Sequence, residues 1–108
     1  MPTAAEKMSA AKEKIERRQD EAAKIGARYK FVLDGDGGGT WMLNLKDDVS
    51  VEEGDGDAEC TVKMGASHFV DLLEGRATAQ ELFFAGKLQI EGDLALAMRL
   101  QSLTEIIG

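Results

Sequence analysis

The chain of 108 residues is long enough for one domain with a single core, and a hydrophobic content of 44% excludes wholesale disorder. Twenty acidic and thirteen basic residues give a formal net charge of -7, which argues against nucleic-acid binding, because that affinity depends on basic side chains at the phosphates. The single cysteine, Cys60, excludes a disulfide within the chain.

The first segment is predicted to be helical. Thr3 and Glu6 have the spacing of a capping box, and Gly26 is a plausible end. The larger apolar residues, among them Met8 and Ile15, make only a thin stripe on a highly charged helix. We therefore expect this helix to pack weakly at its start and firmly only near its end.

Four segments then alternate between apolar and polar residues, at 29–33, 41–45, 49–51 and 58–64. This period of two is typical of strands that bury one face and expose the other. The turns between the segments are short and rich in glycine and acidic residues. The pattern predicts an antiparallel meander of four strands with one apolar face.

The loop at residues 34–39 reads Asp-Gly-Asp-Gly-Gly-Gly and raises the question of a metal or phosphate site. A calcium loop counted from Asp34 would need a glutamate at its twelfth position, where Leu45 stands. A phosphate loop would continue into Gly-Lys-Ser or Gly-Lys-Thr, which is absent here. Asp-Gly between alternating segments is instead a hairpin signal, so we predict a turn and no metal.

The last third of the chain returns to helical spacing. Two short helices are expected, beginning at the capping residues Ser67 and Thr78. A fifth alternating strand follows over residues 87–91, and Asp93 is expected to cap a final helix that continues to Ile107.

The order α-ββββ-αα-β-α predicts one α+β domain over residues 1–108. Its expected core is a five-stranded, mostly antiparallel sheet with one apolar face covered by helices. Residues 1–26 form the N-terminal helix, which we expect to be loosely attached.

No pattern indicates catalysis. His68 has no second ligand at metal-binding spacing, and Cys60 falls on the apolar phase of its strand, where a buried structural thiol is expected. Ser67, His68 and Asp71 stand too close in sequence to orient as a catalytic triad. We expect no enzyme, no metal and no cofactor.

The apolar side chains on the strands and short helices are numerous. A filled core explains them, and a cavity for a hydrophobic ligand is the alternative.

Three stretches resemble the sterol carrier protein 2 domain family: "GTWMLNLKDD", "AECTVKM" and "FVDLLEGRATAQELFFAGKLQIEGDLALAMRL". The similarity spans Tyr29 to Leu103 and is most specific over Phe84–Asp93. It implies a sheet backed by helices that enclose a hydrophobic tunnel for sterols, fatty acids, fatty acyl-CoA or phospholipids. It also implies a carrier instead of a catalyst.

The expected lipid-binding residues combine this resemblance with the apolar pattern. They are Phe31, Trp41, Leu43, Val62, Met64, Phe69, Leu72, Leu73, Leu82, Phe83, Phe84, Leu88, Ile90, Leu96, Met98, Leu100 and Leu103.

Two further expectations follow from the resemblance. Gly65 stands where the family has a helix-starting serine, so Ser67 is expected to take over the cap. Lys46, Lys87 and Arg99 are candidates to meet an anionic headgroup at the tunnel mouth.

The sequence therefore predicts non-catalytic binding and intracellular transfer of lipids by a monomer, with transient contact to a membrane or a lipid-metabolising enzyme and none to nucleic acid. The alternative is an accessory protein-interaction domain with a filled core and no ligand. The sequence shows no signal peptide, transmembrane segment or C-terminal peroxisomal signal, which makes a cytoplasmic location the expectation.

Overall fold

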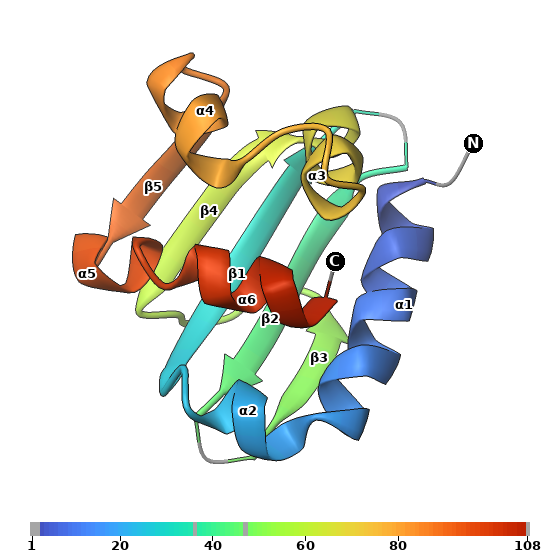
Figure 1. The fold of residues 1–108 in the computed structure, drawn as a ribbon, viewed down its shortest axis with the longest axis vertical. Coiled ribbons are helices and arrows are strands. Elements are labelled where there is room, and N and C mark those ends of the chain that lie inside the picture. Colours follow the sequence, from blue (N-terminus) through green and yellow to red (C-terminus); the bar gives the residue numbers. More distant parts are fainter. Residues whose placement is uncertain (1–2, 36, 47, 108) are drawn as a thin grey trace.

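One five-stranded sheet carries the helices on one of its faces (Figure 1). The computed structural model describes residues 3–35, 37–46 and 48–107. The strands are β1 (Ala27–Asp34), β2 (Gly39–Leu45), β3 (Ser50–Glu53), β4 (Cys60–Gly65) and β5 (Leu88–Gly92). The helices are α1 (Ala4–Arg17), α2 (Gln19–Ala23), α3 (Ala66–Leu73), α4 (Ala79–Phe84), α5 (Leu94–Ala97) and α6 (Leu100–Ile107).

The strand order is β3-β2-β1-β4-β5, and every neighbouring pair except β1 with β4 is antiparallel. The predicted mixed, mostly antiparallel sheet is confirmed, but the four-strand meander is wrong. β4 does not continue beside β3; it pairs in parallel with β1. Alternation assigns each strand a buried face, but it carries no information about which strands are neighbours.

The segment between β3 and β4 returns across the solvent-facing side of the sheet. Lys30 Nζ lies 3.0 Å from Asp55 Oδ1, and the Glu59 N–H donates to the Arg28 carbonyl over 3.1 Å. This crossing explains how β4 reaches β1 without a helix in between.

The glycine-rich loop forms the predicted hairpin, in which Leu33 pairs with Gly39. A Cβ at Gly38 would stand 2.1 Å from the Leu33 carbonyl oxygen, so the tight turn requires glycine there. Asp36 lies outside the described residues, and within the described ones no group of three His, Cys, Asp or Glu could hold a metal ion.

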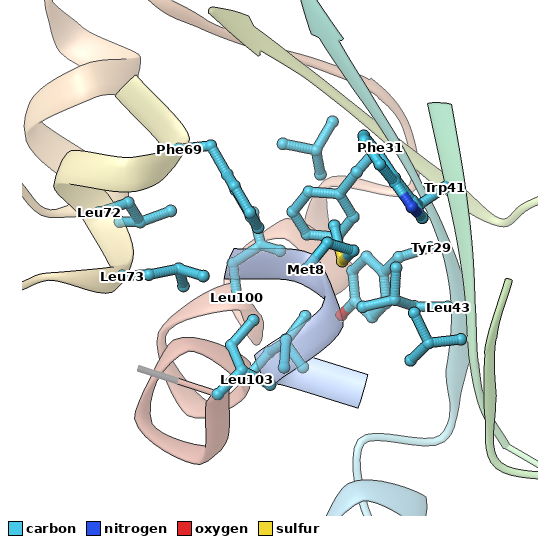
Figure 2. Close-up of a cluster of buried hydrophobic side chains, with 14 of the residues drawn as sticks. Met8, Tyr29, Phe31, Trp41, Leu43, Phe69, Leu72, Leu73, Leu100 and Leu103 are labelled. Atoms are coloured by element: carbon cyan, nitrogen blue, oxygen red, sulfur yellow. The ribbon is translucent and has the colours of Figure 1, made fainter. Parts of the chain in front are cut away.

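The core lies between the inner face of the sheet and the helices (Figure 2). Aromatic rings form its centre: Phe31 and Phe69 meet edge to face at 5.8 Å, and Phe31 lies 6.5 Å from Tyr29. The buried Tyr29 hydroxyl donates a hydrogen bond of 2.6 Å to the Leu96 carbonyl, which fixes α5 to the sheet.

Helix α1 is packed along its whole length, where the sequence predicted a weakly packed start. Ala4, Met8, Ala11 and Ile15 are all buried, because the small alanines let the helix approach the rest of the fold closely. The predicted capping box is present, with the Glu6 N–H 3.1 Å from Thr3 Oγ1.

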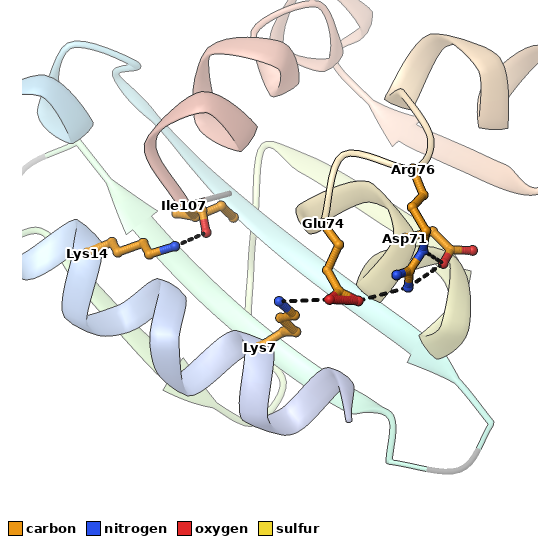
Figure 3. Close-up of polar contacts among 6 residues, drawn as sticks. All are labelled: Lys7, Lys14, Asp71, Glu74, Arg76 and Ile107. Carbon is orange, nitrogen blue, oxygen red and sulfur yellow. Dashed lines mark hydrogen bonds and ion pairs between the residues drawn. The ribbon is translucent and has the colours of Figure 1, made fainter. Parts of the chain in front are cut away.

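Polar contacts add to this attachment at the surface (Figure 3). Lys7 Nζ lies 3.6 Å from Glu74 Oε2 after α3, and Lys14 Nζ donates over 3.4 Å to the Ile107 carbonyl of α6. Arg76 holds Glu74 from the other side at 2.8 Å.

Three helix boundaries differ from those expected. The N-terminal segment is divided at Arg18 into α1 and α2, and the last segment is divided into α5 and α6. Asp93 caps α5 as predicted, accepting from the Ala95 N–H at 2.9 Å. Ser67 is not a cap: β4 leads directly into α3, so Gly65 takes the cap position without a side-chain hydrogen bond.

Replacing Tyr29 with phenylalanine tests how α5 is held. Near neutral pH, Tyr29→Phe should lower the free energy of unfolding by about 1 kcal/mol, because the buried hydrogen bond from the phenol to the Leu96 carbonyl is lost, while that oxygen still accepts from the Arg99 N–H at 3.0 Å. Urea unfolding of both proteins measures this difference.

The same pair of proteins has a predicted pH dependence. Burial raises the pKa of Tyr29 well above its ordinary value, so the folded state keeps the phenol neutral where the unfolded chain ionises. The stabilisation is present below about pH 10 and is lost as the pH rises further. The gap in stability between wild type and Tyr29→Phe should therefore narrow above that pH; a gap that stays constant would contradict this role.

Candidate functional site

An apolar pocket of about 430 Å³ lies at the β5 edge of the sheet. Its volume is within the usual range of small-molecule sites. Helix α4 forms one wall, the core-facing side chains of β5 the floor, and α5 with the start of α6 the other wall. The lining residues are Ala79, Gln80, Phe83, Leu88, Ile90, Leu94, Ala97, Met98, Leu100 and Gln101.

The pocket arises where the helical cover of the sheet runs short. Leu88 and Ile90 point to the core face of β5, since they pair with the inward residues Met64 and Val62 of β4. Above them lie only α4, of six residues, and α5, of four. Leu88 is buried while Ile90 is only half-buried, because these two short helices do not meet over the strand.

The mouth of the pocket is surrounded by exposed apolar side chains. The part of the chain that the structure describes has four large hydrophobic residues that are exposed. They are Phe83 (46% exposed), Phe84 (75%), Leu94 (63%) and Met98 (84%). Phe83, Leu94 and Met98 line the pocket, and the Phe84 ring lies 5.9 Å from that of Phe83. Such a concentrated patch is typical of an interaction site.

Helix α4 buries only one of its three large apolar residues. Of the apolar residues Leu82, Phe83 and Phe84, only Leu82 is buried. Three consecutive residues of a helix point about 100° apart, so a single short helix at a sheet edge cannot bury them all.

The structure separates the expected lipid-binding residues into two groups. Those that line the pocket are Phe83, Leu88, Ile90, Met98 and Leu100, with Phe84 beside it. The others are buried in the core: Phe31, Trp41, Leu43, Phe69, Leu72, Leu73 and Leu103, which Figure 2 labels, and Val62, Met64, Leu82 and Leu96. Leu88 and Leu100 belong to both groups, because they line the pocket and are also buried. The sequence offered a filled core or a cavity as explanations of the many apolar side chains. The structure has both: a filled core under the centre of the sheet and a pocket at its β5 edge.

Five lining residues were not predicted: Ala79, Gln80, Leu94, Ala97 and Gln101. A signal for some of them exists in the sequence. Leu94, Ala97, Met98 and Gln101 follow at intervals of three, one and three, the spacing of one helical face. These residues lie on a different face of the last helical segment from Leu96, Leu100 and Leu103, which are buried.

The basic residues proposed for an anionic headgroup do not line the pocket. The Arg99 guanidinium donates over 2.6 Å to the Ile25 carbonyl, and Lys46 Nζ lies 3.7 Å from Glu59 Oε1. Lys87 is exposed in the turn before β5.

Cys60 is a buried thiol, as predicted. Burial raises its pKa, and the nearby Asp93 carboxylate adds to this shift. The thiol is therefore kept protonated, which is the opposite of what a nucleophile requires.

In the described part of the chain, no helix combines the length and the apolar character that a membrane span requires.

The sequence model of the SCP-2 sterol transfer family matches residues 7–105. Sterol carrier protein 2 of Rattus norvegicus is 40% identical over 96 residues, which are 83% of this chain and 18% of the rat protein. The Homo sapiens protein of that name is 41% identical over 85 residues, 74% of this chain and 16% of its own length. The chain thus spans less than one fifth of these relatives.

Solved structures share the fold. Sterol carrier protein 2 from Yarrowia lipolytica has a TM-score of 0.80 at 27% identity, covering 93% of this chain and 88% of that one. The sterol carrier protein domain of Helicoverpa armigera has a TM-score of 0.78 at 29% identity, covering 97% and 88%. A sterol carrier protein from Aedes aegypti, solved with palmitate, has a TM-score of 0.74 at 22% identity, and the alignment covers 100% of each chain.

A matched pair of alanine substitutions in α4 separates the mouth of the pocket from the core. Leu82→Ala should lower the free energy of unfolding by about 2 to 3 kcal/mol, as expected for a buried leucine. Phe84→Ala should change it by less than about 0.5 kcal/mol, because the ring is mostly exposed. Urea denaturation checks both values, and an equal loss in the two variants would contradict this arrangement of α4.

Proposed function

The chain belongs to the SCP-2 sterol transfer family, and on this premise we propose that it binds hydrophobic lipids in the β5-edge pocket and transfers them without catalysing a reaction. The observation that carries the proposal is the combination of an apolar pocket and a mouth made of exposed apolar side chains. The pocket and its mouth leave apolar surface in contact with water, which is unfavourable. A hydrophobic ligand that covers this surface is the simplest explanation of both features.

The driving force is the removal of a lipid tail from water. Each methylene that enters the pocket contributes about 0.8 kcal/mol. Leu88, Ile90 and Leu100 supply the aliphatic surface for the tail, and Phe83 and Met98 extend that surface to the mouth. A tail can therefore slide from the mouth to the floor in continuous apolar contact.

Helix α5 is suited to adapt to the ligand. It is four residues long and buries only Leu96, whose carbonyl accepts the Tyr29 hydrogen bond. Leu94 and Met98 are exposed on its pocket side. We expect the outer part of α5 and the turn before α6 to move when a lipid enters, while the Tyr29–Leu96 contact stays in place.

The candidate ligands are sterols, fatty acids, fatty acyl-CoA and phospholipids. The family name supports the sterols in this range, and the palmitate held by the Aedes aegypti protein supports the fatty acids. A monomeric, cytoplasmic carrier that makes transient contact with a membrane or a lipid-metabolising enzyme belongs to the same proposal.

A protein-interaction domain is the second candidate, because an exposed patch of two phenylalanines and a methionine could also bind a partner protein. Solvent extraction and native mass spectrometry of the purified protein separate the two. Co-purified lipid supports the carrier. Failure of any lipid, acyl-CoA or sterol to bind at micromolar concentration would exclude it.

Filling the pocket tests its role directly. Ala97→Phe places a ring inside the pocket and should weaken the binding of a fluorescent lipid by about tenfold or more. Ala95→Phe, on the exposed side of the same helix and outside the pocket, is the control and should bind as the wild type does. Equal affinity of Ala97→Phe and wild type, with unchanged circular dichroism, would place the lipid elsewhere.

A further inference from the structure

We propose that the pocket selects lipids whose polar end is uncharged, such as the hydroxyl of a sterol or of a long-chain alcohol, over lipids that end in a carboxylate or a phosphate. This inference rests on the proposed function, because it concerns the headgroup of the lipid that the pocket would hold.

The lining contains no charged side chain. Its only polar side chains are Gln80 on α4 and Gln101 on α6, which stand on opposite walls. In the part of the chain that the structure describes, neither side-chain amide has a protein hydrogen-bond partner. Each amide therefore keeps one acceptor and two donor hydrogens available at the mouth.

The cations nearest in sequence to the lining are held elsewhere or face solvent. Arg99 donates to the Ile25 carbonyl at 2.6 Å, and Lys63, on the strand next to β5, pairs with Glu91 at 3.0 Å. Lys87 is exposed and does not line the pocket.

Acidic groups flank the same walls. Glu81 follows Gln80 on α4, and Asp93 precedes Leu94 at the start of α5. With a net charge of -7 on the whole chain, the potential at the mouth disfavours an approaching anion.

These observations act differently on the two classes of headgroup. A carboxylate that enters the mouth loses hydration, meets no cation and faces a negative potential. A hydroxyl carries no charge, and it can donate to a glutamine carbonyl or accept from a glutamine amide, so part of the hydration that it loses is replaced. The pocket therefore discriminates by headgroup charge while accepting the same tail.

The test uses two fluorescent lipids that share one pyrene-labelled alkyl chain, one ending in a hydroxyl and the other in a carboxylate. At neutral pH the alcohol should bind the wild-type protein about tenfold more tightly. Equal or tighter binding of the carboxylate overturns this inference and leaves the carrier function standing. If neither lipid binds, the carrier function fails and the inference fails with it.

Charge substitutions locate the selectivity. Gln101→Lys and Gln80→Lys each place a cation at the mouth and should raise carboxylate affinity until the preference for the alcohol is lost. Gln89→Lys adds the same charge on the exposed face of β5, opposite Lys63 and outside the pocket, and should leave the preference unchanged. An equal effect of all three substitutions would show that net charge, and not the mouth, sets the preference, and would overturn the inference.

Discussion

The structure depends on one constraint, which is that the apolar face of a five-stranded sheet has to be covered by helices of very unequal length. The fourteen-residue α1 packs beside β3, and α3 and α6, of eight residues each, cover the centre. Only α4 and α5, of six and four residues, remain for β5. Figure 1 shows α1 and these two short helices at opposite edges of the sheet. The pocket is the part of the apolar face that this cover leaves open.

The residues that stabilise the core thus differ in part from those proposed to bind a lipid. Phe31, Tyr29 and Phe69 fill the middle of the molecule, and the Tyr29 hydroxyl holds α5 through the Leu96 carbonyl. The proposed binding surface adds the exposed side chains of Phe83, Leu94 and Met98, whose exposure shows that they contribute little to the stability of the fold. An acidic surface keeps a protein with such an apolar mouth dispersed in water, because like-charged molecules repel one another.

Alternation and caps predicted the strands and the capped helix starts at Thr3, Thr78 and Asp93, because both signals are local. The parallel neighbour of β4 and the break between α5 and α6 could not be predicted, since they depend on which elements meet in space. For the site, the apolar pattern predicted many inward-facing apolar side chains. It could not show which of them fill the core and which line the pocket. Leu43 and Ile90 both point to the core face of their strands, and the helices that cover those strands distinguish them: Ile90 lies on the edge strand β5, under the short helices α4 and α5.

The proposed function requires that a lipid occupies the edge of the sheet and not its middle. Isotope-filtered nuclear Overhauser spectroscopy, with carbon-labelled protein and an unlabelled long-chain lipid, tests it directly. A lipid chain in the β5-edge pocket should give intermolecular contacts to the methyl groups of Leu88, Ile90, Leu94 and Met98. Contacts confined to core side chains such as Leu43 and Val62, or no contact with either group under saturating lipid, would contradict it.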